Sequence, residues 1–167
     1  MNLEDHPTVR RLAAQAPAAE SGPALDGIWL RQVALDCGAD DAGLVDIARP
    51  GLDSQREEIV RNYPWTKSLL SFVVRMAREP VRGAPRSVAN LEFHRAGHEV
   101  DEIAASIVAK LEARGVRAVN PAMGFPIEMY QTPGHAIWVV SHKPIAVESG
   151  GSREVVQIAV GTACEPT

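Results

Sequence analysis

Three polar residues recur at a spacing of four in the middle of the chain: His94, His98 and Glu102. On a helix they would share one face, and a His-x-x-x-His pair can bind a metal ion there. The catalytic form of this pattern has glutamate directly after the first histidine, where this chain has Arg95. Because the sequence offers no identifiable third ligand, we interpret the three residues as a polar helix flank and predict no metal site.

A second candidate is the segment 141–144, which reads SHKP and follows an apolar stretch. Ligand sites form at strand ends in open sheets, and a serine beside a histidine suggests a nucleophile. Adjacent residues on a strand point to opposite faces, however, and the segment lacks a glycine elbow. We predict no catalytic residue here. We expect Ser141, His142 and Lys143 to contact a bound cofactor, with His142 as an axial or polar contact.

The segment 120–134 is expected to be an irregular loop, yet it is rich in large apolar residues. Two interpretations remain open. The loop packs on the protein's own core, or it forms one wall of a cavity for a large, flat, mostly apolar ligand. The residues concerned are Met123, Phe125, Met129 and Tyr130.

Basic residues gather on either side of the most apolar stretch of the chain. A solvated turn and an anion or phosphate contact are both compatible with this clustering. The glycine turn at 150–151 is no phosphate loop, because it lacks the Lys-Ser/Thr ending. The basic residues are Lys67, Arg75, Arg78, Arg82 and Arg86.

The composition limits the classes of function. The chain has 167 residues and a net charge of −4, which suits one domain with a sizeable core and argues against a nucleic-acid surface. No apolar run reaches the ~18 residues of a membrane span. The acidic start, MNLED, lacks the layout of a signal peptide, so we expect a cytoplasmic protein. Cys37 and Cys164 are too few for a zinc site or an iron–sulfur cluster, and no disulfide is expected.

Hydrophobic periodicity and capping residues predict alternating helices and strands. Asp26 is a candidate N-cap of the first secure helix, and Gly38 and Gly115 are stop signals for two helices. The stretch 68–76 is apolar with little alternation, which indicates a strand buried on both faces and central in its sheet. Residues 1–24 are expected to form a mobile arm or a docked helix, and residues 25–167 a single domain with a parallel or mixed sheet. Helices are predicted at 24–38, 52–62 and 87–114, strands at 42–47, 68–76, 116–119, 137–141 and 154–163, and a basic turn at 78–86.

Three segments carry a resemblance to a known family. The segment 63–72, YPWTKSLLSF, resembles the Y-P-x-A-K-S strand entry in the N-terminal region of epoxyqueuosine reductases and their ferredoxin-like relatives. The segment 111–118, LEARGVRA, is similar to that family's L-x-x-x-G-Y-x-A step. The segment 141–147, SHKPIAV, falls where the family has a D-x-x-P turn and a following helix. The resemblance covers residues 25–148 and rests on this pattern rather than on one decisive motif.

The resemblance implies a fold and a ligand. The N-terminal region of that family binds cobalamin in a fold akin to flavin nitroreductases and a cobalamin-processing protein. We therefore expect an α+β domain with a mixed, largely antiparallel central sheet flanked by helices. A corrinoid would lie between the apolar loop and the turn at 141–144. The alternatives are FMN, with Arg78, Arg82 and Arg86 as phosphate contacts, and a non-catalytic interaction domain without a cofactor.

Two departures from the family bear on activity. Ser141 stands where the family's turn has aspartate, the proposed proton donor, and a serine hydroxyl is a very weak acid. The cysteine runs that hold the family's two four-iron clusters are missing from this sequence. Self-contained epoxyqueuosine reduction is therefore not expected, and whether the chain is an enzyme stays open. A separate iron–sulfur electron donor or a second copy of the chain is the partner that we expect.

Overall fold

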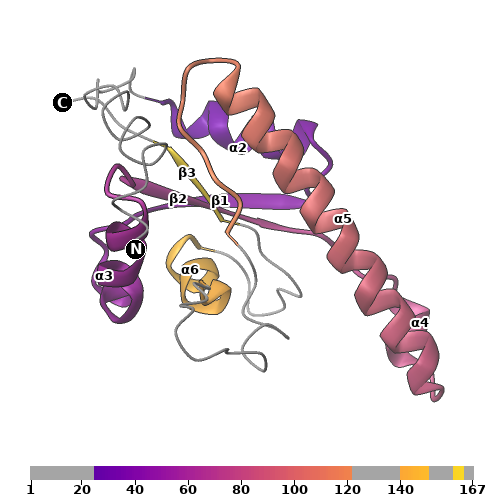
Figure 1. Ribbon diagram of the computed structural model, residues 1–167. Coiled ribbons are helices and arrows are strands. Elements are labelled where there is room, and N and C mark those ends of the chain that lie inside the picture. Colours follow the sequence, from indigo (N-terminus) through magenta and orange to yellow (C-terminus); the bar gives the residue numbers. More distant parts are fainter. Residues whose placement is uncertain (1–24, 122–139, 151–159, 164–167) are drawn as a thin grey trace, which may run out of the picture.

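The structure is a computed structural model that describes residues 25–121, 140–150 and 160–163, the last four as backbone alone. In these residues a small antiparallel sheet lies between helices (Figure 1). Helices α2 (Gly27–Asp36) and α5 (Arg86–Glu112) cover one face of the sheet, and α3 (Asp53–Asn62) and α6 (His142–Glu148) cover the other. The expected α+β class is therefore confirmed.

The described sheet has the strand order β1 (Asp41–Asp46), β2 (Ser68–Val73), β3 (Val160–Ala163). Both pairings are antiparallel: Asp41 lies opposite Val73 in the first, and Ser68 lies opposite Ala163 in the second. The prediction that the apolar strand is central is confirmed, since β2 lies between the other two strands.

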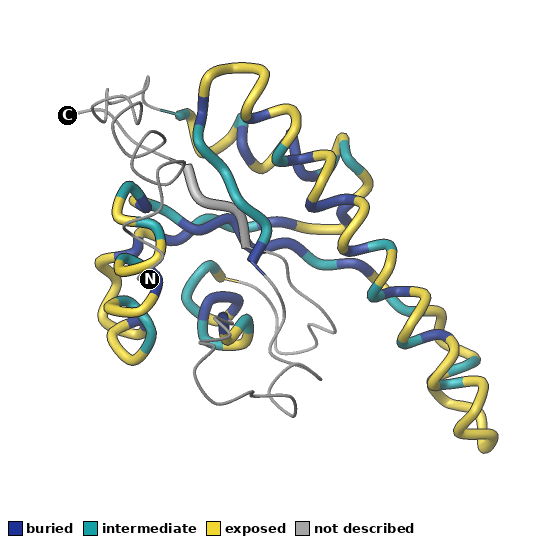
Figure 2. The backbone as a smooth tube through the Cα atoms, viewed as in Figure 1, coloured by how far each residue is buried: buried dark blue, intermediate teal, exposed yellow. Residues whose placement is uncertain are grey.

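Alternate side chains of β2 enter two separate hydrophobic cores, which explains why this strand shows little alternation between apolar and polar residues. Leu70 and Phe72 belong to the core beneath α2 and α5, whereas Leu69 belongs to the core beneath α3 and α6. Figure 2 shows β2 mostly buried, with flanking helices that are exposed on their outer sides. The first core includes Leu30, Val33, Val100, Ile103, Ile107 and Leu111, and the second includes Val45, Ile47, Leu52, Ile59 and Ile145.

Capping residues act as the sequence predicts on the first helix. The carboxylate of Asp26 accepts a hydrogen bond from the backbone N–H of Ile28 at 2.9 Å, which makes Asp26 the N-cap of α2. Gly38 then takes φ +110°, a conformation that favours glycine and lets the chain turn into β1.

The outer end of α5 extends beyond the sheet, and the short helix α4 (Arg78–Arg82) lies against it (Figure 1). No residue of α4 is buried, and Val88 and Leu91 on the first turns of α5 are exposed. The buried positions of α5 begin at Glu92 and continue to Leu111. No helix in the described part of the chain is long and apolar enough to span a membrane.

Several predicted elements differ from the structure. The basic turn at 78–86 contains a helix, α4, and a 3-10 helix (Pro50–Leu52) precedes α3. The strand predicted at 116–119 was wrong, because these residues form neither strand nor helix. Of the strand predicted at 137–141, residues 137–139 lie outside the described residues. Ser141 is the N-cap residue of α6 rather than part of a strand. In the strand predicted at 154–163, residues 154–159 lie outside the described residues, and residues 160–163 form β3.

Candidate functional site

The turn at Ser141 is held by a side chain far away in the sequence. The amide group of Gln55 on α3 donates to the carbonyl oxygen of Ser141 and accepts from its N–H, each at 3.1 Å. This pair of bonds imitates strand pairing and positions the start of α6. The serine side chain itself makes no capping hydrogen bond to α6 and is exposed.

The predicted cofactor contacts 141–143 lie on a helix start rather than on a strand end. Lys143 is exposed on α6, whereas both ring nitrogens of His142 are shielded from solvent. Ser141 and His142 are therefore not neighbours on a strand, where their side chains would point to opposite faces. Ser141 and Lys143 are the accessible members of the predicted site.

Helix α6 packs unusually closely on the elements beside it. A Cβ atom at Gly43 of β1 would collide with the backbone oxygen of Ser149, and one at Gly51 would collide with the side chain of Glu148. The carboxylate of Glu148 also lies 3.8 Å from the guanidinium of Arg49. The two glycines thus allow α6 to lie against β1 and the 3-10 helix, which completes the second core.

The apolar loop residues of the predicted site lie outside the described part of the chain. This applies to Met123, Phe125, Met129 and Tyr130. Their contact with the turn at 141–144 stays a prediction.

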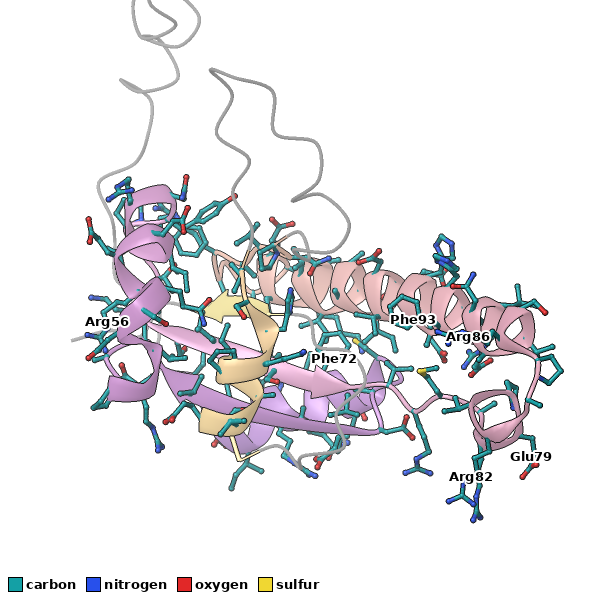
Figure 3. All side chains as sticks on the ribbon, turned by 90° about the horizontal axis from the view of Figure 1, so that it is seen from below. Arg56, Phe72, Glu79, Arg82, Arg86 and Phe93 are labelled. Carbon is teal, nitrogen blue, oxygen red and sulfur yellow. The ribbon has the colours of Figure 1, made fainter. Side chains whose placement is uncertain are left out.

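The basic cluster expected from the sequence is divided by β2. Lys67 precedes the strand, and the basic residues from Arg75 to Arg86 follow it. A strand of this length spans about 20 Å, at about 3.3 Å per residue. Figure 3 shows Arg82 and Arg86 at the end of the molecule opposite to Arg56. Lys67 therefore does not share a site with the arginines.

The arginines that follow β2 border a groove of about 790 Å³. Its walls come from α2, from the start of β1, from the end of β2 with the residues after it, and from α4. The lining residues are Arg31, Asp40, Asp41, Val73, Val74, Arg75, Met76, Arg78, Val81 and Arg82.

The two aspartates of the groove are already engaged by the protein. Asp41 accepts a hydrogen bond from Arg31 at 2.7 Å and another from the N–H of Ala42, and these bonds hold the pKa of its carboxyl below the usual value. Asp40 accepts the backbone N–H of Arg75 at 2.6 Å, and the Arg75 guanidinium lies 3.8 Å away. The carboxylates thus fix the groove at the end of the sheet.

The other end of the same segment is held by a buried carboxylate. Glu92 of α5, only 7% exposed, accepts the N–H of Ala77 at 2.5 Å. It also accepts two hydrogen bonds from Arg95, at 2.6 and 2.8 Å. Arg95 donates a further hydrogen bond to the Glu99 carboxylate at 2.6 Å. The Arg95 guanidinium, and then the Ala77 N–H, lower the pKa of Glu92 to about 2. Because Ala77 is the N-cap of α4, this carboxylate positions the groove wall.

Two arginines of the groove are not engaged in this way. Arg78 and Arg82 form no ion pair with any acidic group in the described residues, although Glu79 lies on the same short helix. Both are exposed, and they lie one helical turn apart on α4. Their guanidinium groups are therefore available to an outside anion.

The histidines considered for metal binding, His94 and His98, are exposed on α5. Within 25–121, 140–150 and 160–163, no three histidine, cysteine, aspartate or glutamate side chains come together as metal ligands would. Neither the groove nor the role of Glu92 was expected from the sequence. The i, i+3 and i, i+4 spacing of Glu92, Arg95 and Glu99 in the sequence could have indicated that Glu92 forms an ion pair.

No protein-family model matches the chain, and no curated protein matches it.

Proposed function

We propose that this chain is a corrinoid-binding domain whose ligand contacts Ser141 and Lys143. The observation that carries the proposal is the start of α6 directly after Ser141, in the sequence segment that resembles the turn and helix of a cobalamin-binding region. The antiparallel sheet with helices on both faces is compatible with the same resemblance. Ligand sites beside sheet and helix ends are common in such layered folds.

The accessible groups at this turn suit the amide-rich rim of a corrinoid. Ser141 offers a hydroxyl that donates and accepts hydrogen bonds, and Lys143 offers an ammonium group that donates to amide or phosphate oxygens. His142 is not assigned an axial role, because its ring nitrogens are shielded. The apolar residues Met123 and Phe125, with Met129 and Tyr130, would cover the face of the ring.

The same turn argues for binding without self-contained reduction. A hydroxyl at Ser141 cannot serve as a general acid near neutral pH as a carboxylic acid does. The sequence contains two cysteines, fewer than one four-iron cluster requires. Under this proposal, any electron delivered to the corrinoid comes from iron–sulfur clusters outside these 167 residues.

The experiment is a titration of the purified chain with cob(II)alamin, followed by absorbance and then by desalting. We expect a shifted spectrum and corrinoid that is retained at one equivalent per chain. Lys143→Ala should weaken binding about fivefold or more, as expected for the loss of one charged hydrogen bond. Gln32→Ala, which removes an exposed contact to Asp36 on α2, is the matched control and should bind normally.

An unshifted spectrum with no corrinoid retained would rule out the proposal. A parallel titration with FMN distinguishes the alternative cofactor. Uptake of FMN but not of corrinoid would assign the chain to the flavin-dependent class instead. Uptake of neither ligand would favour a non-catalytic interaction domain.

A further inference from the structure

We propose that the arginine groove at the end of β2 binds a small ligand that carries a phosphate group and an apolar portion. The groove shares no residue with the turn at 141–144, so this inference is independent of corrinoid binding. It depends on the charge of the lining, on its apolar floor, and on the contacts that hold its walls.

The lining carries an excess of positive charge in a chain that is acidic as a whole. Four arginines and two aspartates line the groove, which leaves 4 − 2 = +2, whereas the chain has −4. Both aspartates already accept hydrogen bonds from the protein, as described above. Arg78 and Arg82 form no ion pair within the described ranges, so their charge is directed to solvent or to a ligand. Guanidinium groups bind phosphate oxygens in a bidentate manner, which favours phosphate as the anion.

The groove also presents apolar side chains that a bare anion would not need. Val74 is buried in its floor, and Val81 on α4 is 50% exposed between the two arginines in sequence. Met76, which lies in the chain between Val74 and Val81, also lines the groove. A volume of about 790 Å³ is much larger than a phosphate ion and lies within the range of about 300–1,000 Å³ of small-molecule sites. A phosphate ester with an apolar or aromatic group fits both features.

The walls of the groove are held in place before any ligand arrives. The Asp40 carboxylate accepts a hydrogen bond from the N–H of Arg75, and the Glu92 carboxylate accepts one from the N–H of Ala77, so the segment 74–77 is attached at two points. Arg95 in turn holds the carboxylate of Glu92. A preformed site loses less conformational entropy on binding, which favours affinity for a small ligand.

A second copy of the chain is a poorer occupant of this surface. Docking groove to groove would bring Arg78 and Arg82 against the same arginines of the partner, and like charges that face each other across an interface are unfavourable. An acidic peptide from another protein would satisfy the charge, and the experiment below includes it.

The test is an NMR titration of the ¹⁵N-labelled, backbone-assigned full chain with phenyl phosphate. Inorganic phosphate, phenol and a glutamate-rich peptide serve as separate probes. We expect phenyl phosphate to shift the amides of Arg75, Met76, Arg78, Val81 and Arg82, with an affinity at least about tenfold above that of inorganic phosphate. Phenol should shift these amides little, because it lacks the charge.

Two variants locate the site. Arg78→Ala/Arg82→Ala should weaken phenyl phosphate binding at least about tenfold, and Val81→Ser should reduce the advantage of phenyl phosphate over inorganic phosphate. All three positions are exposed, so the fold should survive, and the spectrum itself reports this. Arg61→Ala/Lys110→Ala removes the same charge from exposed sites on α3 and α5 and should bind as the parent chain does.

Three outcomes would overturn the inference. The first is the absence of shifts with phenyl phosphate at millimolar concentration. The second is an equal loss of binding in both double variants, which would indicate a general charge effect. The third is a response of these amides to the acidic peptide alone, which would make the groove a protein-docking surface.

Discussion

Gln55 and Ser141 are joined by two hydrogen bonds between one side-chain amide and one backbone unit, at 3.1 Å each. The residues are 86 positions apart, and the contact connects α3 to the start of α6. The two bonds hold the turn at 141–144, which is predicted to contact a ligand, against α3. This contact also makes Gln55 a positioning residue for Ser141.

Gln55→Ala is expected to loosen the start of α6. The loss of two neutral hydrogen bonds should lower the free energy of unfolding by about 1–3 kcal/mol. Hydrogen exchange should become faster for the amides of 145–149, whereas the amides of α2 should be unchanged. Gln32→Ala is the control, and should stay within about 0.5 kcal/mol of the parent chain. Equal exchange rates in α6 of the two variants would contradict the positioning role.

Glu92→Gln is expected to change how stability depends on pH. The pKa of Glu92 is lowered to about 2 from the model-compound value of 4.5, so the native state favours the ionised carboxylate. This contribution to stability is fully present above the unfolded-state pKa and is lost as the pH falls from 4.5 towards 2. The variant should be less stable than the parent chain at pH 7, and its stability should fall less steeply through that window.

The measurement for Glu92 is urea unfolding at a series of pH values. Glu57→Gln is the control, because Glu57 pairs with Arg61 at a fully solvated surface of α3. Exposed pairs of this kind contribute little, so the control should keep the parent profile. Identical profiles for Glu92→Gln and the parent chain would contradict the assignment.

Gly43→Ala is expected to displace α6 from β1. The added Cβ collides with the backbone oxygen of Ser149, which cannot move without shifting the end of the helix. Overpacking of this kind costs about 1–3 kcal/mol of stability. Gly115→Ala is an informative comparison, since nothing lies within 4 Å of its added Cβ and its cost comes from φ +76° alone. Urea unfolding should show both losses, but only Gly43→Ala should speed hydrogen exchange in α6.

Ile107→Ala and Leu91→Ala should distinguish the two halves of α5. Ile107 is 2% exposed in the core above the sheet, so its truncation should cost about 2–5 kcal/mol. Leu91 is 71% exposed and precedes the first buried residue of the helix, and its truncation should change stability by less than about 0.5 kcal/mol. Thermal or urea unfolding of both variants measures the difference. A comparable loss from Leu91→Ala would mean that this surface is covered in solution.

The elements that the sequence predicted well are those governed by neighbouring residues. The long helix was expected at 87–114 and is found at Arg86–Glu112, because apolar residues recur at helical spacing from Ala96 to Leu111 and Gly115 lies just beyond its end. Asp26 caps its helix through a bond to a residue two positions away. The central place of β2 followed from its lack of regular alternation between apolar and polar residues, which is typical of a strand buried on both faces.

The sequence alone could not define where β2 ends or what lies beyond it. The strand was expected to reach residue 76, but it stops at Val73, because the N–H groups of Arg75 and Ala77 bond to Asp40 and Glu92 instead. These carboxylates are 35 and 15 residues away, beyond the reach of local propensity. Asp40 lies beside Arg75 because the strand register sets Asp41 opposite Val73. Glu92 lies beside Ala77 because α5 packs on the sheet.

The candidate sites show the same division. The sequence by itself determined which residues are basic, which residues could begin a ligand-binding turn at Ser141, and that helices and a sheet would form together. Only the tertiary structure decided that Lys67 is separated from the arginines, that Gln55 holds Ser141, and that Arg78 and Arg82 border a groove. The physical reason is that propensity and periodicity act over one or two helical turns, whereas a binding site is assembled by strand register and by long-range hydrogen bonds.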